Sequence, residues 1–152
     1  MQLALYQPEI AGNVGAVLRT AACFAVPVHI IEPCGFPLSS RDLKRAAMDY
    51  ADAALPTRHA DWVAFADAMA ADQNRVILLT TRGSESLDGF AFGEGDVLLL
   101  GSEGSGVSEA IHQAVAAKVR IPLANGMRSL NLSVSAGIAV FEALRQTGRL
   151  PR

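Results

Sequence analysis

The feature that most restricts the fold is a set of short, strongly apolar segments that alternate with helical segments. Residues 75–81, RVILLTT, form the clearest of these segments. Continuous apolar runs of this kind are typical of strands buried on both faces in a parallel sheet. Shorter runs of the same type occupy residues 3–6, 28–31, 97–100 and 119–123. The alternation predicts an α/β domain with a mostly parallel sheet flanked by helices.

Polar residues that can cap a helix precede most of the predicted helices. Asn13 opens the first, Asp61 precedes a helix with an inward stripe of Trp62, Phe65 and Met69, and Ser108 precedes a helix through Ala116. Side chains of this type accept hydrogen bonds from the N–H groups of the first turn, which have no partner within the helix. A last helix is expected from about residue 131 to residue 146.

A basic face is expected on a further short helix, which Ser39 or Ser40 would cap. Arg41, Lys44 and Arg45 share this face at i, i+3 and i+4 spacing. Most such clusters are solvated surface. The cluster therefore indicates a nucleic-acid contact only if other residues already point to RNA.

Three loops follow predicted strands late in the chain, at residues 80–83, 101–106 and 123–129. Parallel sheets bind their ligands at the carboxyl ends of the strands. We therefore expect these loops to form one pocket from separate segments.

The loop from Gly101 to Gly106, GSEGSG, follows a strand and precedes a helix. Its glycines would let the backbone approach a ligand and present N–H groups to it. It is neither a phosphate-binding loop, which needs GK[ST], nor the dinucleotide fingerprint, whose spacing differs. An ordinary turn explains the glycines equally well, although Glu103 could accept a hydrogen bond from an arginine or a ligand amine.

The stretch from Ile121 to Glu142 places four polar side chains at the start of an apolar helix, namely Arg128, Ser129, Asn131 and Ser133. For Ser129 alone, a helix cap is the simpler interpretation. The density of polar groups between two apolar segments favours a ligand site at the helix N-terminus. By contrast, the pattern Asn13-x-Gly15-x-x-x-Arg19 by itself indicates only a capped helix with a solvated arginine.

The composition excludes several classes of protein. The 152 residues are 51% apolar and 18% charged, with a net charge of −2, which predicts one globular domain over residues 1–152 and excludes RNA binding by bulk positive charge. Cys23 and Cys34 suggest reduced thiols in a cytoplasm, and the scattered histidines (His29, His59, His112) predict no metal site. We find no signal peptide and no run near the roughly 20 apolar residues that a membrane span needs.

Together, these motifs resemble the SPOUT RNA methyltransferases. NxGxxxR, HIIEPCGFP, LTTRG, LLLGSEGSGVS and RIPLANGMRSLNLSVSAGIAVFEALRQ occur in the family's order and cover nearly the whole chain. The last two motifs are specific for the 2′-O-methylating branch. The N-terminal LYQPEIAGNVGAVLR is most similar to the small enzymes that methylate the wobble cytidine or uridine of tRNA, although Glu103–Ser108 is closer to other relatives.

The resemblance implies a C-terminal trefoil knot that binds S-adenosyl-L-methionine, and a homodimer whose active site the partner completes. The implied cofactor contacts are Leu79, Gly101, Ile121, Leu123, Ser129 and Leu130. It further implies that Arg19 is the base or activating group for the ribose hydroxyl. We expect Asn13 and Glu103 to orient Arg19, and Ser129 and Asn131 to hold the ribose or cofactor. The substrate would be the anticodon stem-loop of tRNA.

Because a guanidinium stays protonated, we expect Arg19 to position a phosphate and stabilise developing oxyanion charge instead of removing a proton. Candidate phosphate contacts are Arg41, Lys44, Arg45 and Arg128, with Arg145 and Arg149 as further candidates. Two other functions remain open. One is 2′-O-methylation of another tRNA position or of rRNA, and the other is a non-catalytic RNA-binding module of the same fold.

Overall fold

A computed structural model describes residues 1–38 and 55–152, and in these residues seven parallel strands form one sheet in the order β3-β2-β1-β6-β4-β7-β5. The expected parallel α/β architecture is therefore confirmed. The strands are β1 (Gln2–Tyr6), β2 (Val28–Ile31), β3 (Thr57–His59), β4 (Arg75–Leu79), β5 (Glu85–Ser86), β6 (Asp96–Leu100) and β7 (Ala117–Arg120). The helices are α1 (Ala11–Cys23), α3 (Trp62–Ala71), α4 (Glu109–Ala114) and α5 (Leu132–Gln146).

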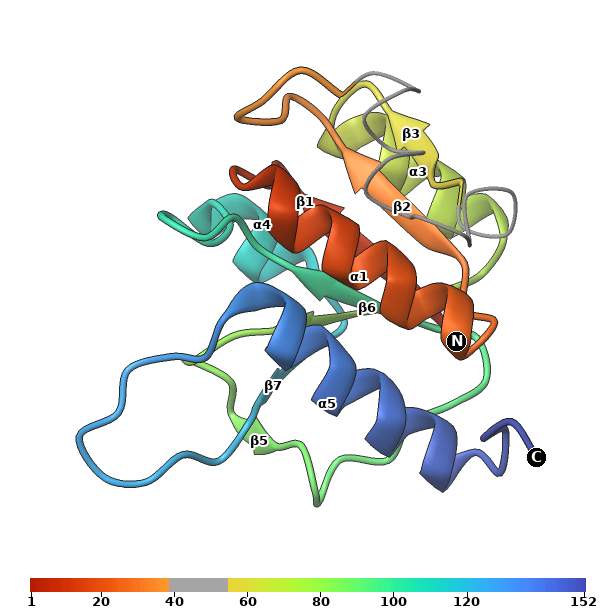
Figure 1. Ribbon diagram of the computed structural model, residues 1–152, viewed down its shortest axis with the longest axis vertical. Helices are drawn as coiled ribbons and strands as arrows, with labels where there is room; N and C mark the ends of the chain where they lie inside the picture. The colour runs from red at the N-terminus through yellow and green to blue at the C-terminus, as the bar shows by residue number, and fades with distance from the viewer. Residues whose placement is uncertain (39–54) are drawn as a thin grey trace.

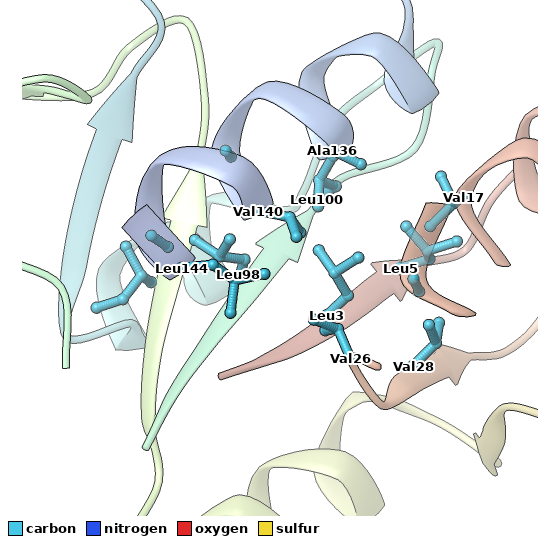
Figure 2. Packing of buried hydrophobic residues seen from close by; sticks show 14 of the residues in the cluster. Leu3, Leu5, Val17, Val26, Val28, Leu98, Leu100, Ala136, Val140 and Leu144 are labelled. Carbon is cyan, nitrogen blue, oxygen red and sulfur yellow. The ribbon is translucent and has the colours of Figure 1, made fainter. Parts of the chain in front are cut away.

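Helices cover both faces of the sheet (Figure 1). On one face, α1 and α5 lie side by side and bury Val17, Ala136 and Val140 against Leu5 and strand β6 (Figure 2). On the other face, α3 buries Phe65 and Met69 against alternate residues of the strands. Ile111 of α4 and Val115, just after α4, pack into the same cluster. The central strands are buried on both faces for this reason: all five residues of β6 are buried.

Local capping signals predicted two helix starts correctly. The Asp61 side chain accepts from Ala64 N at 2.8 Å and begins α3, and the Ser108 side chain accepts from Ile111 N at 3.3 Å and begins α4. Helix α4 ends at Ala114, two residues earlier than expected.

One helix start and one candidate cap differ from the expectation, whereas α5 begins at Leu132, close to the expected residue 131. Helix α1 begins at Ala11 after Ile10, whose side chain makes no capping bond, so Asn13 lies inside the first turn. Helix α5 is capped by Asn131 and not by Ser129, because the Asn131 carboxamide accepts from Ser133 N at 2.9 Å. For α1, the Asn13 side chain is hydrogen-bonded to Glu103 and Asn131 instead of capping the helix. For α5, Asn131 takes the capping position in place of Ser129.

The sheet extends further than the sequence indicated. Strands β3 and β5 were not expected, since three and two residues carry no measurable alternation. The strand expected over residues 119–123 is β7, which occupies Ala117–Arg120. Ile121 and Leu123 therefore follow the strand instead of belonging to it, and they lie in the connection between β7 and α5. The expected helix with Arg41, Lys44 and Arg45 lies outside the described residues.

Candidate functional site

A pocket of about 520 Å³ lies at the carboxyl ends of β4, β6 and β7. Three loops form its walls, as the sequence predicted: the segment after β4, the glycine-rich loop after β6, and the long connection from β7 to α5, which swings outward in light blue in Figure 1. All six residues expected to contact a cofactor line it: Leu79, Gly101, Ile121, Leu123, Ser129 and Leu130. Segments more than 40 residues apart in sequence thus converge on one cavity.

Two glycines allow the backbone to close around this pocket. A Cβ atom at Gly101 would lie 2.6 Å from the carbonyl carbon of Gly106, across a loop that is closed by paired hydrogen bonds between Ser102 and Gly106 at 3.0 and 2.9 Å. A Cβ at Gly83 would lie 2.4 Å from the carbonyl carbon of Val119. Because backbone atoms cannot give way as a flexible side chain can, both positions require glycine.

Glu103, Asn13 and Asn131 form a chain of hydrogen bonds at the pocket, which we call the hydrogen-bond relay. The Asn13 amide donates to Glu103 Oε1 at 2.9 Å, and the Asn131 amide donates to Asn13 Oδ1 at 3.0 Å. The Asn131 Oδ1 atom then accepts from the first turn of α5. The relay connects the loop after β6, helix α1 and helix α5, and all three of its residues line the pocket.

The ionised form of Glu103 is the stable one. Burial alone would raise the pKa of this carboxyl, but hydrogen bonds from the Asn13 amide and from the backbone N–H groups of Glu9 and Ile10 outweigh burial and lower it. A carboxylate can only accept hydrogen bonds, so it fixes the NH₂ group of Asn13 toward itself. In this orientation the Asn13 Oδ1 atom faces Asn131 and accepts a hydrogen bond from its NH₂ group, so the orientation of the Asn131 amide is fixed as well.

Arg19 is not part of the pocket wall. It lies on the exposed side of α1, almost two turns after Asn13. The structure therefore brings together four of the five residues expected at the catalytic centre, Asn13, Glu103, Ser129 and Asn131, and places the fifth outside.

The candidate phosphate contacts divide into three groups. Arg128 is exposed on the loop before α5. Arg145 pairs with Glu142 at 2.8 Å and Arg149 with Glu94 at 3.2 Å, so their charges are partly compensated. Arg41, Lys44 and Arg45 lie outside the described residues.

The sequence did not single out several residues that line the pocket. They include the buried Ser102, Arg82 at the rim, Ser135 on α5 and His112 on α4. Arg82 and Ser102 lie within the motifs LTTRG and GSEGSG, so the motifs themselves were the available signal. His112 carried no signal, because a single histidine on a short helix is ordinarily a core residue.

The family model described as the SpoU rRNA methylase family matches residues 1–141. The chain belongs to this family. It is 46% identical over 152 residues to a tRNA (cytidine(34)-2′-O)-methyltransferase of Ancylobacter novellus, covering 100% of this chain and 96% of that protein. The recognition of a SPOUT 2′-O-methyltransferase of the wobble-position type is thereby confirmed.

Solved structures agree with this assignment. One described as giving insight into the 2-OH methylation of C/U34 on tRNA superposes with a TM-score of 0.89 and 43% identity, over 95% of this chain and 94% of that chain. An AdoMet-bound rRNA methyltransferase from Sinorhizobium meliloti superposes with a TM-score of 0.83 and 29% identity, over 95% of this chain and 55% of that longer chain.

Two further observations concern only residues 1–38 and 55–152. None of the helices there combines the length and the apolar character needed to cross a bilayer. No group of three or more His, Cys, Asp or Glu side chains there could hold a metal ion.

Proposed function

We propose that this protein transfers a methyl group from S-adenosyl-L-methionine to the ribose 2′-hydroxyl of the wobble nucleotide, a cytidine or a modified uridine, in the anticodon stem-loop of tRNA. The observation that carries the proposal is the convergence of three loops on one pocket with the hydrogen-bond relay along its edge. The relative from Ancylobacter novellus, which matches over the full length, supports the choice of nucleotide.

The pocket fits an adenosyl ligand in size and chemistry. Its volume of about 520 Å³ lies in the range of roughly 300–1,000 Å³ that small-molecule sites occupy. Leu79, Leu100, Ile121 and Leu123 give the pocket apolar lining that would pack against a purine ring, and the relay and Ser129 add polar groups to the same lining. The methyltransferase from Sinorhizobium meliloti, which contains AdoMet, supports the same ligand here.

When bound, the cofactor supplies an activated methyl group on a sulfonium centre. The residues of this chain would then orient the acceptor, since in-line approach is what proximity and orientation accelerate. Ser129 and Asn131 stand at the pocket's edge and would hold the ribose or the cofactor. Glu103 and Asn13 keep the Asn131 amide in one orientation.

Arg19 would bind the phosphate next to the target ribose and stabilise the charge that develops on the 2′-oxygen. A guanidinium group is not a base at neutral pH, so the proton would leave through that phosphate or through water. Asn13 and Glu103 remain the groups we propose to orient it. Arg19 lies outside the pocket of its own chain, which agrees with a site that a second copy completes.

We propose a homodimer that forms through the outer face of α1 and α5. Val134, Ile138 and Phe141 recur at i, i+4 and i+7 on α5 and are 49%, 40% and 49% exposed. The ring of Phe141 meets Phe24 at the end of α1 edge-on, with centroids 6.4 Å apart, so the two helices present one continuous apolar surface. Large exposed patches of this kind mark interaction sites. Arg19 lies on the exposed side of α1, which a dimer of this kind would turn toward the partner.

Phosphate contacts would come from Arg41, Lys44, Arg45 and Arg128. Binding through such residues weakens steeply as salt rises. We also propose that residues 1–152 form one domain that works in the cytoplasm, and that the C-terminal segment forms a trefoil knot. These points stay predictions.

The function is tested by incubating the protein with tritiated S-adenosylmethionine and bulk tRNA, followed by nuclease mapping of the label. We expect label on the ribose of nucleotide 34. Label at another tRNA position, or on rRNA alone, would instead establish the alternative substrate. Binding of RNA without transfer would establish the non-catalytic module. Arg19→Lys should retain cofactor affinity and lose turnover, and unchanged turnover would contradict the role given to Arg19.

The dimer is tested separately. Ile138→Asp places a charge in the apolar surface and should halve the mass measured by light scattering, whereas Val63→Asp, at an exposed apolar residue on α3, should leave the mass unchanged. A wild-type protein that is already monomeric at micromolar concentration would refute this interface.

A further inference from the structure

The three histidines of the chain are buried, but only two of them have hydrogen-bonding partners for their ring nitrogens. His29 Nδ1 lies 2.9 Å from His59 Nε2, and His29 Nε2 lies 2.6 Å from Gln2 Oε1. His112 differs. Its Nε2 is the one buried side-chain nitrogen or oxygen among residues 1–38 and 55–152 that has no hydrogen-bond partner.

His112 forms part of the wall of the pocket. It lies on α4, directly after Ile111, which packs into the core on that face of the sheet. His112 lines the pocket together with residues 79–82, 100–103 and 105–107. Only 7% of the residue is exposed. The wall of the pocket therefore includes a residue that is nine-tenths buried and whose inward Nε2 no protein atom satisfies.

A buried nitrogen without a hydrogen-bond partner destabilises the folded state, because it has given up its hydrogen bond to water without replacing it. Native proteins satisfy the great majority of such groups, and an exception requires an explanation. A ligand that reaches this wall would supply the missing partner. A turn of the imidazole about its Cβ–Cγ bond exchanges the positions of Nε2 and Cε1 without moving the backbone, so the nitrogen can meet a ligand that enters the pocket.

Because His112 is only 7% exposed, its burial indicates which part of an adenosyl ligand meets the ring once it has turned. A ligand group in contact with a buried atom must leave water, which is far more costly for a charged group than for a neutral one. The amino-acid end of S-adenosylmethionine carries a carboxylate and an ammonium, whereas its nucleoside end is neutral. Adenine offers both an amino donor and ring-nitrogen acceptors, and a neutral imidazole can match either.

We propose that His112 is a specificity-determining residue whose Nε2 forms a hydrogen bond with the nucleoside half of the adenosyl ligand. This inference rests on the proposed function, because it takes the pocket to be the adenosyl site. Three walls of backbone and apolar side chains select the shape of the ligand, and His112 adds a directed contact to the base or its ribose.

The test is isothermal titration calorimetry with 5′-methylthioadenosine, which has the nucleoside but no charged end, and with S-adenosylhomocysteine, which has both. His112→Leu should weaken the binding of both compounds by a similar factor, roughly tenfold, because it removes a contact to the part they share. His112→Gln, whose amide nitrogen can occupy a position near Nε2, should bind within about threefold of the wild type. Gln113→Leu, an exposed position on the same helix, is the matched control and should bind normally.

Each other outcome decides against the inference. Wild-type affinity of His112→Leu for 5′-methylthioadenosine would overturn it, as would a loss confined to S-adenosylhomocysteine. Equal losses in the Leu and Gln variants would show that ring shape matters and the hydrogen bond does not. If the wild-type protein binds neither compound, the proposal that S-adenosylmethionine is the cofactor is refuted, and this inference is refuted with it. If the wild-type protein binds both compounds and His112→Leu binds them equally well, only the role of His112 is refuted.

Two measurements separate ligand binding from folding. In the ligand-free protein, His112→Leu removes an unsatisfied group and should raise Tm by about 2–4 °C, while it lowers ligand affinity. A residue with a structural role would lower both. If the Leu variant does not fold, the ¹⁵N resonance of His112 Nε2 in the wild-type protein should shift on addition of 5′-methylthioadenosine, and an unchanged resonance would refute the contact.

Discussion

Replacing Glu103 should disturb the cap of α5, although Glu103 and Asn131 are joined only through Asn13. Glu103 accepts three hydrogen bonds, at 2.8 Å from Glu9 N, 3.3 Å from Ile10 N and 2.9 Å from the Asn13 amide. The residues Glu9 and Ile10 are exposed, so their N–H groups can turn to water, and most of the loss falls on the half-buried Asn13. A hydrogen bond to a charged acceptor contributes ~1.5–3 kcal/mol, and Glu103→Gln keeps its geometry but not its charge, so we expect a loss of about 1–2 kcal/mol.

The less direct consequence follows from amide orientation. With glutamine at position 103, the Asn13 amide is no longer forced to point its NH₂ group at that residue, and a flipped Asn13 would present NH₂ to the NH₂ of Asn131. The Asn131 amide would then turn and withdraw its oxygen from the first turn of α5. Loss of a helix cap costs roughly 1 kcal/mol. Glu103→Gln and Asn131→Ala should therefore be coupled by about that amount.

Urea denaturation of the four proteins of this double-mutant cycle, at one protein concentration, measures the coupling. The same cycle in an Asn13→Ala background is the control, because there the relay has lost its middle member and the coupling should vanish. Independent sites add to within about 0.3–0.5 kcal/mol. Additivity within that margin in the wild-type background, or equal coupling in both backgrounds, would refute the relay.

Three further predictions concern other parts of the molecule. Burial lowers the pKa of both His29 and His59, and the charge of His59 lowers the pKa of His29 further. Below about pH 6.5 the unfolded chain therefore binds more protons than the folded protein, so the free energy of unfolding should fall from pH 7 to pH 5. His59→Gln should flatten this slope in urea titrations, and an unchanged slope would contradict this explanation. Gly101→Ala should weaken S-adenosylhomocysteine binding at least about tenfold in calorimetry, because the new Cβ would lie 2.6 Å from the backbone of Gly106. The control is Gly12→Ala, whose Cβ would have no atom within 4 Å. It should stabilise the protein by about 0.5–1 kcal/mol and leave binding intact. Asp61→Ala should lower stability by about 1 kcal/mol through loss of the α3 cap, seen as a lower Tm, and a change in ligand affinity would show that α3 influences the pocket.

The parts of the fold that the sequence predicted correctly are those that local chemistry decides. Ser108 and Asp61 cap helices because the groups they accept from lie three residues away, and no distant partner competes for them. The apolar run at residues 75–81 had no stable place other than the centre of a sheet. The three pocket loops were predicted because each follows such a strand.

The errors occur where a distant residue decides the outcome. Asn13 resembles a helix cap in sequence, but Glu103, 90 residues later, accepts its amide hydrogen and Asn131 donates to its oxygen. Strand β5 exists only because Glu85 and Ser86 pair with β7. Ile121 and Leu123 look like the end of a strand because they are apolar, yet they line the pocket, and periodicity cannot distinguish a residue buried in a sheet from one that lines a cavity.

The three walls of the pocket are held in different ways. This difference explains why the N-terminal motif around Asn13 and the C-terminal motif around Asn131 act in one site. The walls after β4 and β6 are fixed by backbone contacts at Gly83 and Gly101. The third wall, residues 121–131, is largely exposed and reaches away from the sheet before it returns to α5 (Figure 1). Its far end is held by the bond from Asn131 to Asn13, on the helix that also carries Arg19. Helix α1 therefore supports the least constrained wall of the pocket and presents the residue proposed to act on the substrate, so a displacement of α1 would alter both at once.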